Sequence, residues 1–211
     1  MNITCYDLTG TKVKDITLDK TIFGAKVNDI LMAQAVRIYL ANQRLASARS
    51  LTRADVDRTR KKLYRQKGTG GARHGDRKSP IFVGGGKAHG PKLEQNFDLN
   101  FPKKMKKVAL KSALTVRMQE KSIIALAESK LNKPSAKQAA TFIATVYKPE
   151  EQRKVALIIG DKQDVIAKSF RNLKAVSYYR ASDLTTYDVL QNYRLLVTEE
   201  GLTQLVERLQ K

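Results

Sequence analysis

The chain has 211 residues, with 40 Lys and Arg against 20 Asp and Glu, so its formal net charge at pH 7 is +20. The length allows one core of ordinary domain size, and the single Cys excludes a disulfide within the chain and suits a reducing compartment. The charge indicates an anionic partner, and the lack of any apolar run near the roughly 18 residues of a membrane span favours nucleic acid over lipid.

The N-terminal part reads as two strands and a helix. Apolar runs at Ile3–Leu8 and Val13–Leu18 predict a β-hairpin at the edge of a sheet. A helix is expected to begin after Asn28, a good N-cap residue, with Val27 packing on Met32. No signal-peptide pattern precedes these elements, which predicts a soluble cytoplasmic protein.

The segment 46–101 shows no helical or strand period. Between Arg44 and Lys92 the sequence carries 14 Lys and Arg against three Asp, together with eight of the twelve glycines, among them the triplet Gly84–Gly86. Such a segment repels itself and has little apolar surface to bury, so alone in water it is expected to be disordered. Its cations suit phosphates, its glycine N–H groups can approach phosphate oxygens, and its aromatic rings can stack on bases. We therefore predict a long extended loop that folds on RNA.

After the loop, a basic helix is expected to begin at Pro102. It should carry one basic face and one small or apolar face, formed by Lys104, Lys107 and Lys111 and by Met105, Val108, Ala109 and Ser112, respectively.

The rest of the chain alternates between runs suited to strands and runs suited to helices. The strands are expected at Ser122–Ala127, Val155–Gly160, Ala175–Tyr179 and Arg194–Val197, and the helices at Ser135–Val146, Lys162–Phe170, Thr186–Leu190 and Glu199–Leu209. This alternation predicts a Rossmann-like α/β fold, with a mostly parallel central sheet and helices on both faces but no nucleotide site. The expected organisation is strands and first helix over 1–45, the basic loop over 46–101, and the remaining α/β domain over 102–211.

No residues suggest a cofactor, a metal or enzymatic chemistry. The triplet Gly84–Gly86 invites a phosphate-loop interpretation, but the Walker spacing needs Gly at Ile81 and Ser or Thr at Ala88. His74 and His89 have no Cys or carboxylate at ligand spacing, which argues against a zinc site.

Several short motifs resemble the signature loop of the universal L-four family of large-ribosomal-subunit proteins. They are Arg65–Gly70, Ala72–Arg73, Ser79–Ile81, Gly85–Gly86 and Gly90–Lys92, continued by Pro102–Lys104 and Ala109–Leu114. The resemblance implies a structural constituent of the large subunit that binds its rRNA and supports assembly. It also implies that the loop tip helps to line the peptide exit tunnel, beside another extended ribosomal protein, and that Lys67 faces the tunnel.

The residues and the resemblance together give a set of candidate sites. Contacts to rRNA are expected at Arg44, Arg49, Arg53, Arg58, Arg60, Lys61, Lys62, Tyr64, Arg65, Gln66, Lys67, Gly68, Thr69, Gly70, Arg73, His74, Arg77, Lys78, Ser79, Phe82, Lys87, His89, Lys92, Lys103, Lys104, Lys107 and Lys111. The tunnel-lining positions implied are Arg65, Gln66, Lys67, Gly68, Thr69 and Gly70. The implied partners are large-subunit rRNA, neighbouring ribosomal proteins and the nascent peptide.

The sequence departs from the family pattern at three places. Leu63–Tyr64 replaces the usual Pro-Trp, Gly71 stands where Arg is usual, and Leu93–Gln95 replaces Pro-Arg-Asp. Two other classes of function use the same loop: a nucleic-acid-processing enzyme, for which the sequence offers no carboxylate cluster or acid/base pair, and a free RNA chaperone or regulator, which the sequence does not distinguish.

Overall fold

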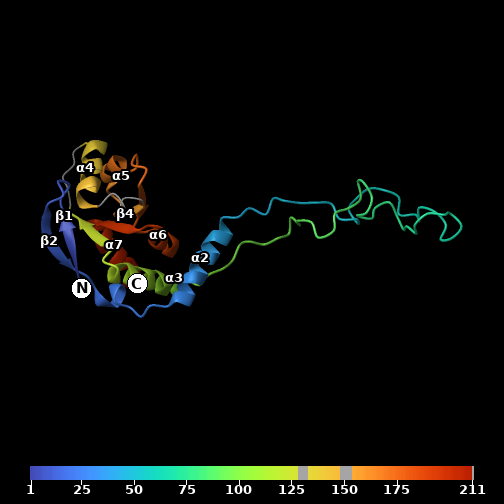
Figure 1. The fold of residues 1–211 in the computed structure, drawn as a ribbon. Coiled ribbons are helices and arrows are strands. Elements are labelled where there is room, and N and C mark those ends of the chain that lie inside the picture. Colours follow the sequence, from blue (N-terminus) through green and yellow to red (C-terminus); the bar gives the residue numbers. More distant parts are fainter. Residues whose placement is uncertain (128–132, 148–153, 211) are drawn as a thin grey trace. The chain divides into compact units, whose positions relative to one another are not determined.

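The computed structural model describes residues 1–127, 133–147 and 154–210. The chain divides into two units (Figure 1). The first, here called the α/β unit, is Met1–Tyr39 with Asn100–Lys211, and the second, here called the loop unit, is Leu40–Leu99. Within the described ranges, no helix is long and apolar enough to cross a membrane.

One sheet of six strands forms the centre of the α/β unit, in the order β2-β1-β3-β6-β4-β5. The strands are β1 (Asn2–Tyr6), β2 (Lys12–Thr17), β3 (Ile123–Leu126), β4 (Val155–Ile159), β5 (Val176–Arg180) and β6 (Arg194–Thr198). The pair β1 and β2 is antiparallel and lies at one edge, whereas every other neighbouring pair is parallel. The predicted edge hairpin and mostly parallel sheet are therefore confirmed.

The helices follow the predicted order, with one addition. They are α1 (Lys20–Phe23), α2 (Asp29–Asn42), α3 (Lys103–Gln119), α4 (Ala136–Val146), α5 (Asp164–Phe170), α6 (Thr186–Gln191) and α7 (Glu199–Gln210). The short helix α1 was not predicted. Asp19 caps it by accepting a hydrogen bond from the Thr21 N–H at 2.9 Å, and its buried residues are Ile22 and Phe23. The basic segment therefore follows the second helix rather than the first.

Helices cover both faces of the sheet, as predicted. In β4 every residue is buried, because alternate side chains enter two different apolar clusters. Val155, Leu157 and Ile159 pack with residues of α4 and α5, whereas Ala156 and Ile158 pack with residues of α3, α6 and α7. Figure 1 shows α4 and α5 on one side of the sheet and α3 and α7 on the other.

Side-chain caps fix the starts of two helices, and the predicted cap Asn28 is confirmed. The Leu31 N–H donates to the Asn28 side chain at 3.0 Å at the start of α2. The Gly201 N–H donates to the Thr198 hydroxyl at 3.1 Å at the start of α7. Each side chain satisfies a backbone donor that has no partner inside the helix.

The predicted apolar face of α3 is wrong in its first turn. Ala109 and Ser112 are buried as expected, but Met105 and Val108 are exposed. The buried stripe of α3 begins at Ala109, which shares a small apolar cluster with Phe101 and Leu31, and the residues of α3 before it are not covered.

Candidate nucleic-acid interface

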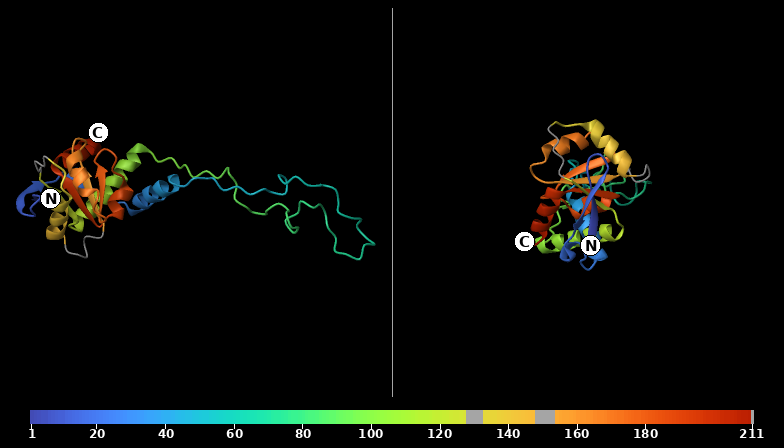
Figure 2. Two further views of the ribbon diagram at one scale, coloured as in Figure 1. Left: turned by 90° about the horizontal axis from the view of Figure 1, so that it is seen from above. Right: turned by 90° about the vertical axis from the view of Figure 1, so that its left-hand side faces the viewer.

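The backbone of the loop unit forms two limbs with no regular secondary structure. Residues 43–102 are all described, and none lies in a helix or strand. Figure 2 shows the limbs running side by side. Backbone hydrogen bonds between them join Ser50 N to Pro91 O (3.0 Å), Lys87 N to Leu51 O (2.8 Å) and Leu63 N to Gly75 O (2.8 Å). Where the loop unit begins and ends, the Asn42 side chain accepts a hydrogen bond from Leu99 N at 2.8 Å and donates one to Leu99 O at 3.1 Å.

Within the glycine triplet Gly84–Gly86, Gly86 lies against the backbone of the other limb. A β-carbon at Gly86 would be 2.2 Å from the backbone nitrogen of Arg53 on the other limb. Gly84 has φ +75°, and the Arg58 guanidinium donates to the neighbouring Val83 carbonyl at 2.8 Å. Glycine is thus required here for the close approach of two backbones.

This geometry corrects one expectation for the triplet. The Gly86 N–H donates to Lys78 O and the Gly85 N–H to Phe82 O, each at 2.9 Å. Both donors are therefore used inside the loop unit, and neither is free for a phosphate oxygen. Gly86 therefore serves the close approach of the limbs, and neither its N–H nor that of Gly85 contributes to a phosphate cradle.

The end of the loop unit is a turn closed by the Leu63–Gly75 hydrogen bond. It contains Gly68 and Gly70, with φ of +77° and +67°, a backbone conformation that favours glycine. The Arg65 guanidinium donates to Gly68 O at 3.0 Å across this turn. All six candidate tunnel-lining residues, 65–70, lie within it.

Three aromatic side chains of the loop unit pack on one another. The rings of Tyr64 and His74 meet edge to face with centroids 6.0 Å apart, and those of His74 and Phe82 lie 4.9 Å apart. The Tyr64 hydroxyl also donates to the Ala72 carbonyl. Each ring is half-buried, so part of the surface expected to stack on bases is used within the loop unit.

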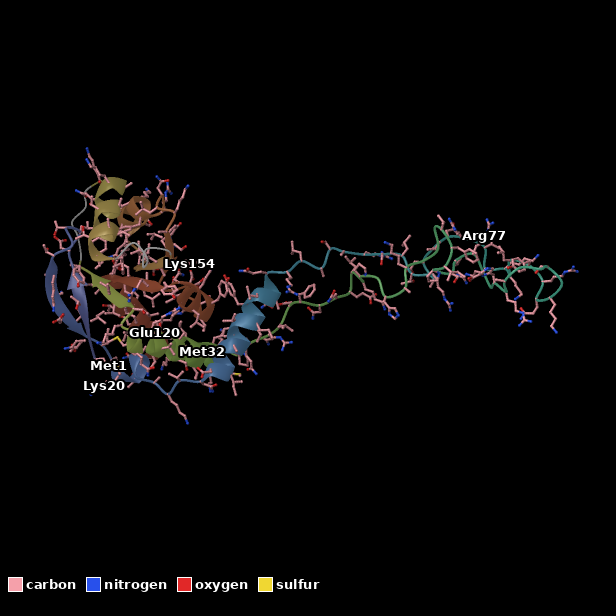
Figure 3. All side chains as sticks on the ribbon, viewed as in Figure 1. Met1, Lys20, Met32, Arg77, Glu120 and Lys154 are labelled. Atoms are coloured by element: carbon pink, nitrogen blue, oxygen red, sulfur yellow. The ribbon has the colours of Figure 1, made fainter. Side chains whose placement is uncertain are left out.

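The candidate cations of the loop unit are exposed, with one exception. Arg44, Arg49, Arg53, Arg58, Arg60, Lys61, Lys62, Arg65, Lys67, Arg73, Arg77, Lys87 and Lys92 are exposed, as are Gln66, Thr69 and His89. Lys78 is only 6% exposed and offers little surface to a phosphate, while Ser79 is half-buried. Figure 3 shows the side chains of the loop unit projecting along its length, with Arg77 labelled.

The loop cations have no carboxylate partners among the described residues. The ion pairs there are Lys12–Asp15, Lys14–Glu199 and Arg117–Glu120, all in the α/β unit. Asp55 instead closes a turn: the Thr52 hydroxyl and N–H both donate to it, and these bonds hold the pKa of Asp55 below its ordinary value. The loop unit therefore carries an excess of positive charge that no ion pair among the described residues offsets.

The α/β unit adds basic residues at the start of α3. Lys103 and Lys104 are exposed, and Lys107 and Lys111 are half-buried. Lys106 is exposed as well and was missed, although it belongs to the same run of lysines. The described residues contain no group of three or more His, Cys, Asp or Glu that could hold a metal ion.

Comparisons with known proteins agree with this geometry. Residues 16–208 match the model of the ribosomal protein L4/L1 family. The chain is 32% identical over 205 residues to the large ribosomal subunit protein uL4 of Alkaliphilus metalliredigens, covering 97% of both chains. It is 37% identical over 202 residues to the uL4 protein of Halothermothrix orenii, covering 96% of this chain and 95% of the relative. The uL4 protein of Parabacteroides distasonis is 36% identical over 203 residues, which is 96% of each chain.

Proposed function

Because the chain belongs to the ribosomal protein L4/L1 family, we propose that it is a structural component of the large ribosomal subunit whose loop unit binds rRNA. It is not an enzyme, and it works on the ribosome in the cytoplasm together with rRNA and other ribosomal proteins. Within that setting, the α/β unit serves as the folded support, and the loop unit provides the main RNA contacts and promotes subunit assembly.

The observation that carries the proposal is the excess positive charge of the loop unit. Its Lys and Arg side chains, apart from Lys78, are exposed and make no ion pair within the described residues. Gathering like charges on two adjoining limbs costs electrostatic free energy. Phosphates of RNA would offset this cost by lying against the cations, and the counterions that the RNA then releases would favour binding. The hydrogen bonds between the limbs partly order the loop unit before RNA binds.

The terminal turn suits the finer role of lining the peptide exit tunnel. In this proposal Arg65, Gln66, Lys67, Gly68, Thr69 and Gly70 face the nascent peptide, beside another extended ribosomal protein. Their turn is held by the hydrogen bond from Arg65 to Gly68 O and contains two glycines of positive φ, and its cations are exposed. Gly71, where the family usually has Arg, removes one positive charge from this turn.

Limited proteolysis of the free protein and of assembled large subunits tests the proposal. We expect cleavage between residues 49 and 97 in the free protein and protection in the subunit, because RNA would enclose both limbs. Sedimentation in moderate salt separates a stoichiometric component, which stays with the large subunit, from a free RNA-binding regulator, which washes off. Equal cleavage in both states, or loss of the protein at moderate salt, would overturn the proposal.

A further inference from the structure

Three residues far apart in the sequence meet at the N-terminal ends of β4 and β6, two neighbouring strands in the interior of the sheet. The Tyr193 N–H donates to Lys154 O at 2.7 Å, and the Arg194 N–H donates to the same carbonyl at 3.2 Å. The Arg194 guanidinium donates to Lys121 O at 3.1 Å. The turn before β6, the residue before β4 and the turn after α3 are thereby held together, and none of them belongs to the loop unit.

Tyr193 is exposed although its backbone is firmly held. Its side chain is 68% exposed, and no aromatic ring packs on it in the part of the chain that the structure describes. The preceding residue, Asn192, is buried and donates from its side chain to Asp188 O at 2.7 Å. A ring with an open face on a backbone held by hydrogen bonds suits stacking on an unpaired base.

Lys121 occupies a backbone conformation that is costly for its residue type. It follows the end of α3 with φ +52°, and its N–H donates to Met118 O at 3.0 Å, as in the helix ends that usually carry glycine. A residue with a β-carbon is strained in this conformation, whereas glycine adopts it freely. A lysine at this position therefore points to a use for its charge.

The local charge is positive. Lys121 and Lys154 are exposed, and neither forms an ion pair within the described ranges. The nearby carboxylate of Glu120 is bound by Arg117 at 2.7 Å. Arg117 is fixed in turn by donating to Val189 O and Leu190 O. The two lysines thus have no ion-pair partner in the described ranges, and they lie in backbone segments that hydrogen bonds hold next to the Tyr193–Arg194 segment.

We propose that Tyr193, Lys121 and Lys154 form a second RNA site, which binds an unpaired nucleotide. The base stacks on the Tyr193 ring, and the adjoining phosphates lie against the two ammonium groups. An acidic peptide would satisfy the lysines but would leave the flat face of the ring without a matching partner, so RNA is favoured. This inference rests on the proposed function, because it takes RNA as the partner, but it assigns RNA binding to a part of the α/β unit away from the start of α3 and outside the loop unit.

The absence of tryptophan from the chain provides a direct test. In the full-length Tyr193→Trp variant, the new indole is the only tryptophan and reports on stacking through its fluorescence. We expect a short single-stranded RNA to quench this emission saturably, and an RNA duplex of the same sequence to quench it much less. Adding Lys121→Gln and Lys154→Gln should raise the RNA concentration for half-quenching about tenfold, since two phosphate contacts are lost.

Two matched variants separate the outcomes. Tyr178→Trp places the reporter at another exposed tyrosine of the α/β unit, where the emission should not change. Tyr64→Trp places it in the loop unit, where RNA binding is already proposed. The second site is overturned, while the proposed function stands, if RNA quenches the Tyr64→Trp variant but not the Tyr193→Trp variant. Equal quenching of the Tyr178→Trp and Tyr193→Trp variants would also overturn the second site while the proposed function stands. If neither the Tyr64→Trp nor the Tyr193→Trp variant responds, both proposals fall.

A photo-crosslinking amino acid at position 193 of assembled large subunits completes the test. An RNA adduct supports the site, whereas an adduct to protein alone, or none, overturns it.

Discussion

The α-carbon of Gly86 lies against the backbone of Arg53, leaving no room for a side chain between the two limbs of the loop unit. We expect Gly86→Ala to push the two limbs apart at this point, because its β-carbon would stand 2.2 Å from the Arg53 nitrogen. RNA binding should weaken about tenfold, since RNA must then order the limbs itself. Hydrogen exchange at Lys87, whose N–H bonds to Leu51 O, should become faster.

Gly75→Ala is the matched control for that experiment. No atom lies within 4 Å of a β-carbon built at Gly75, and its φ is not positive. RNA affinity and hydrogen exchange should match the parent protein. Equal RNA affinity and equal hydrogen exchange in the two variants would show that the close contact at Gly86 does not order the loop unit.

Neutralising exposed loop cations should change the salt dependence of RNA binding. Arg60 and Lys61 are exposed and form no ion pair in the described part of the chain. In the Arg60→Gln, Lys61→Gln double variant, the slope of log affinity against log salt should fall by roughly one for each lost phosphate contact. Filter binding over a range of salt measures this slope. Lys137→Gln, on the exposed side of α4, should leave it unchanged.

Cys5 should resist alkylation in the folded protein. Burial, aided by the hydrogen bond from Sγ to Glu199 Oε1 at 3.5 Å, raises the pKa of the Cys5 thiol from 9.0 to about 11. At pH 8 the thiolate fraction should be roughly a hundredfold lower than in the unfolded chain, so labelling should require unfolding.

The same pKa shift predicts how stability depends on pH. Between pH 9 and about 11 the unfolded chain loses the Cys5 proton while the folded chain keeps it, so the free energy of unfolding falls as the pH rises through this window. Other groups titrate there too, and Cys5→Val isolates the thiol. Urea unfolding of both proteins across this window should show a shallower decline in the variant. Parallel curves would contradict the assigned shift.

Loss of the Thr185 cap should destabilise the α/β unit. Thr185 and Asp188 form a reciprocal capping box at the start of α6, with Asp188 N donating to the Thr185 hydroxyl at 3.3 Å and Thr185 N donating to Asp188 Oδ2 at 2.9 Å. Thr185→Ala should cost about 1 kcal/mol and lower Tm by roughly 2–4 °C, as measured by circular dichroism. Thr203→Ala, which removes an exposed hydroxyl within α7, should change stability by less than about 0.5 kcal/mol.

Arg208 should stabilise the C-terminal helix through two carbonyls. Its Nη1 donates to Ala181 O at 2.9 Å and to Leu184 O at 3.0 Å, and burial lowers the pKa of its guanidinium. Arg208→Gln should reduce the free energy of unfolding by about 1–3 kcal/mol, because a charged donor to both acceptors is lost. Arg171→Gln, at an exposed arginine, is the control and should be close to neutral. Equal denaturation curves for the two variants would contradict the role given to Arg208.

The α/β elements were readily predicted from the sequence because their signals are local. A run such as Val155–Ile159 between polar segments predicts a buried strand, and Asn28 and Thr198 mark helix starts through their own chemistry. Helix α1 was missed because four residues hold little more than one turn, too short for a helical period.

Features that depend on distant contacts could not be predicted in the same way. Whether Met105 is covered depends on where Phe101 packs, and whether Lys78 is exposed depends on how the limbs fold together. The close approach of the limbs at Gly86 could be predicted only by knowing that Arg53 lies opposite it. The residues next to Tyr193 in the sequence do not indicate an RNA site, because Lys121 and Lys154 come from other parts of the chain.

The paired hydrogen bonds between Asn42 and Leu99 join the two ends of the loop unit to each other. Since the segment 43–98 contributes no strand to the sheet, it can lengthen, shorten or change composition without any strand being re-registered. Such an arrangement allows the reach of the protein into RNA to evolve separately from the stability of its folded body.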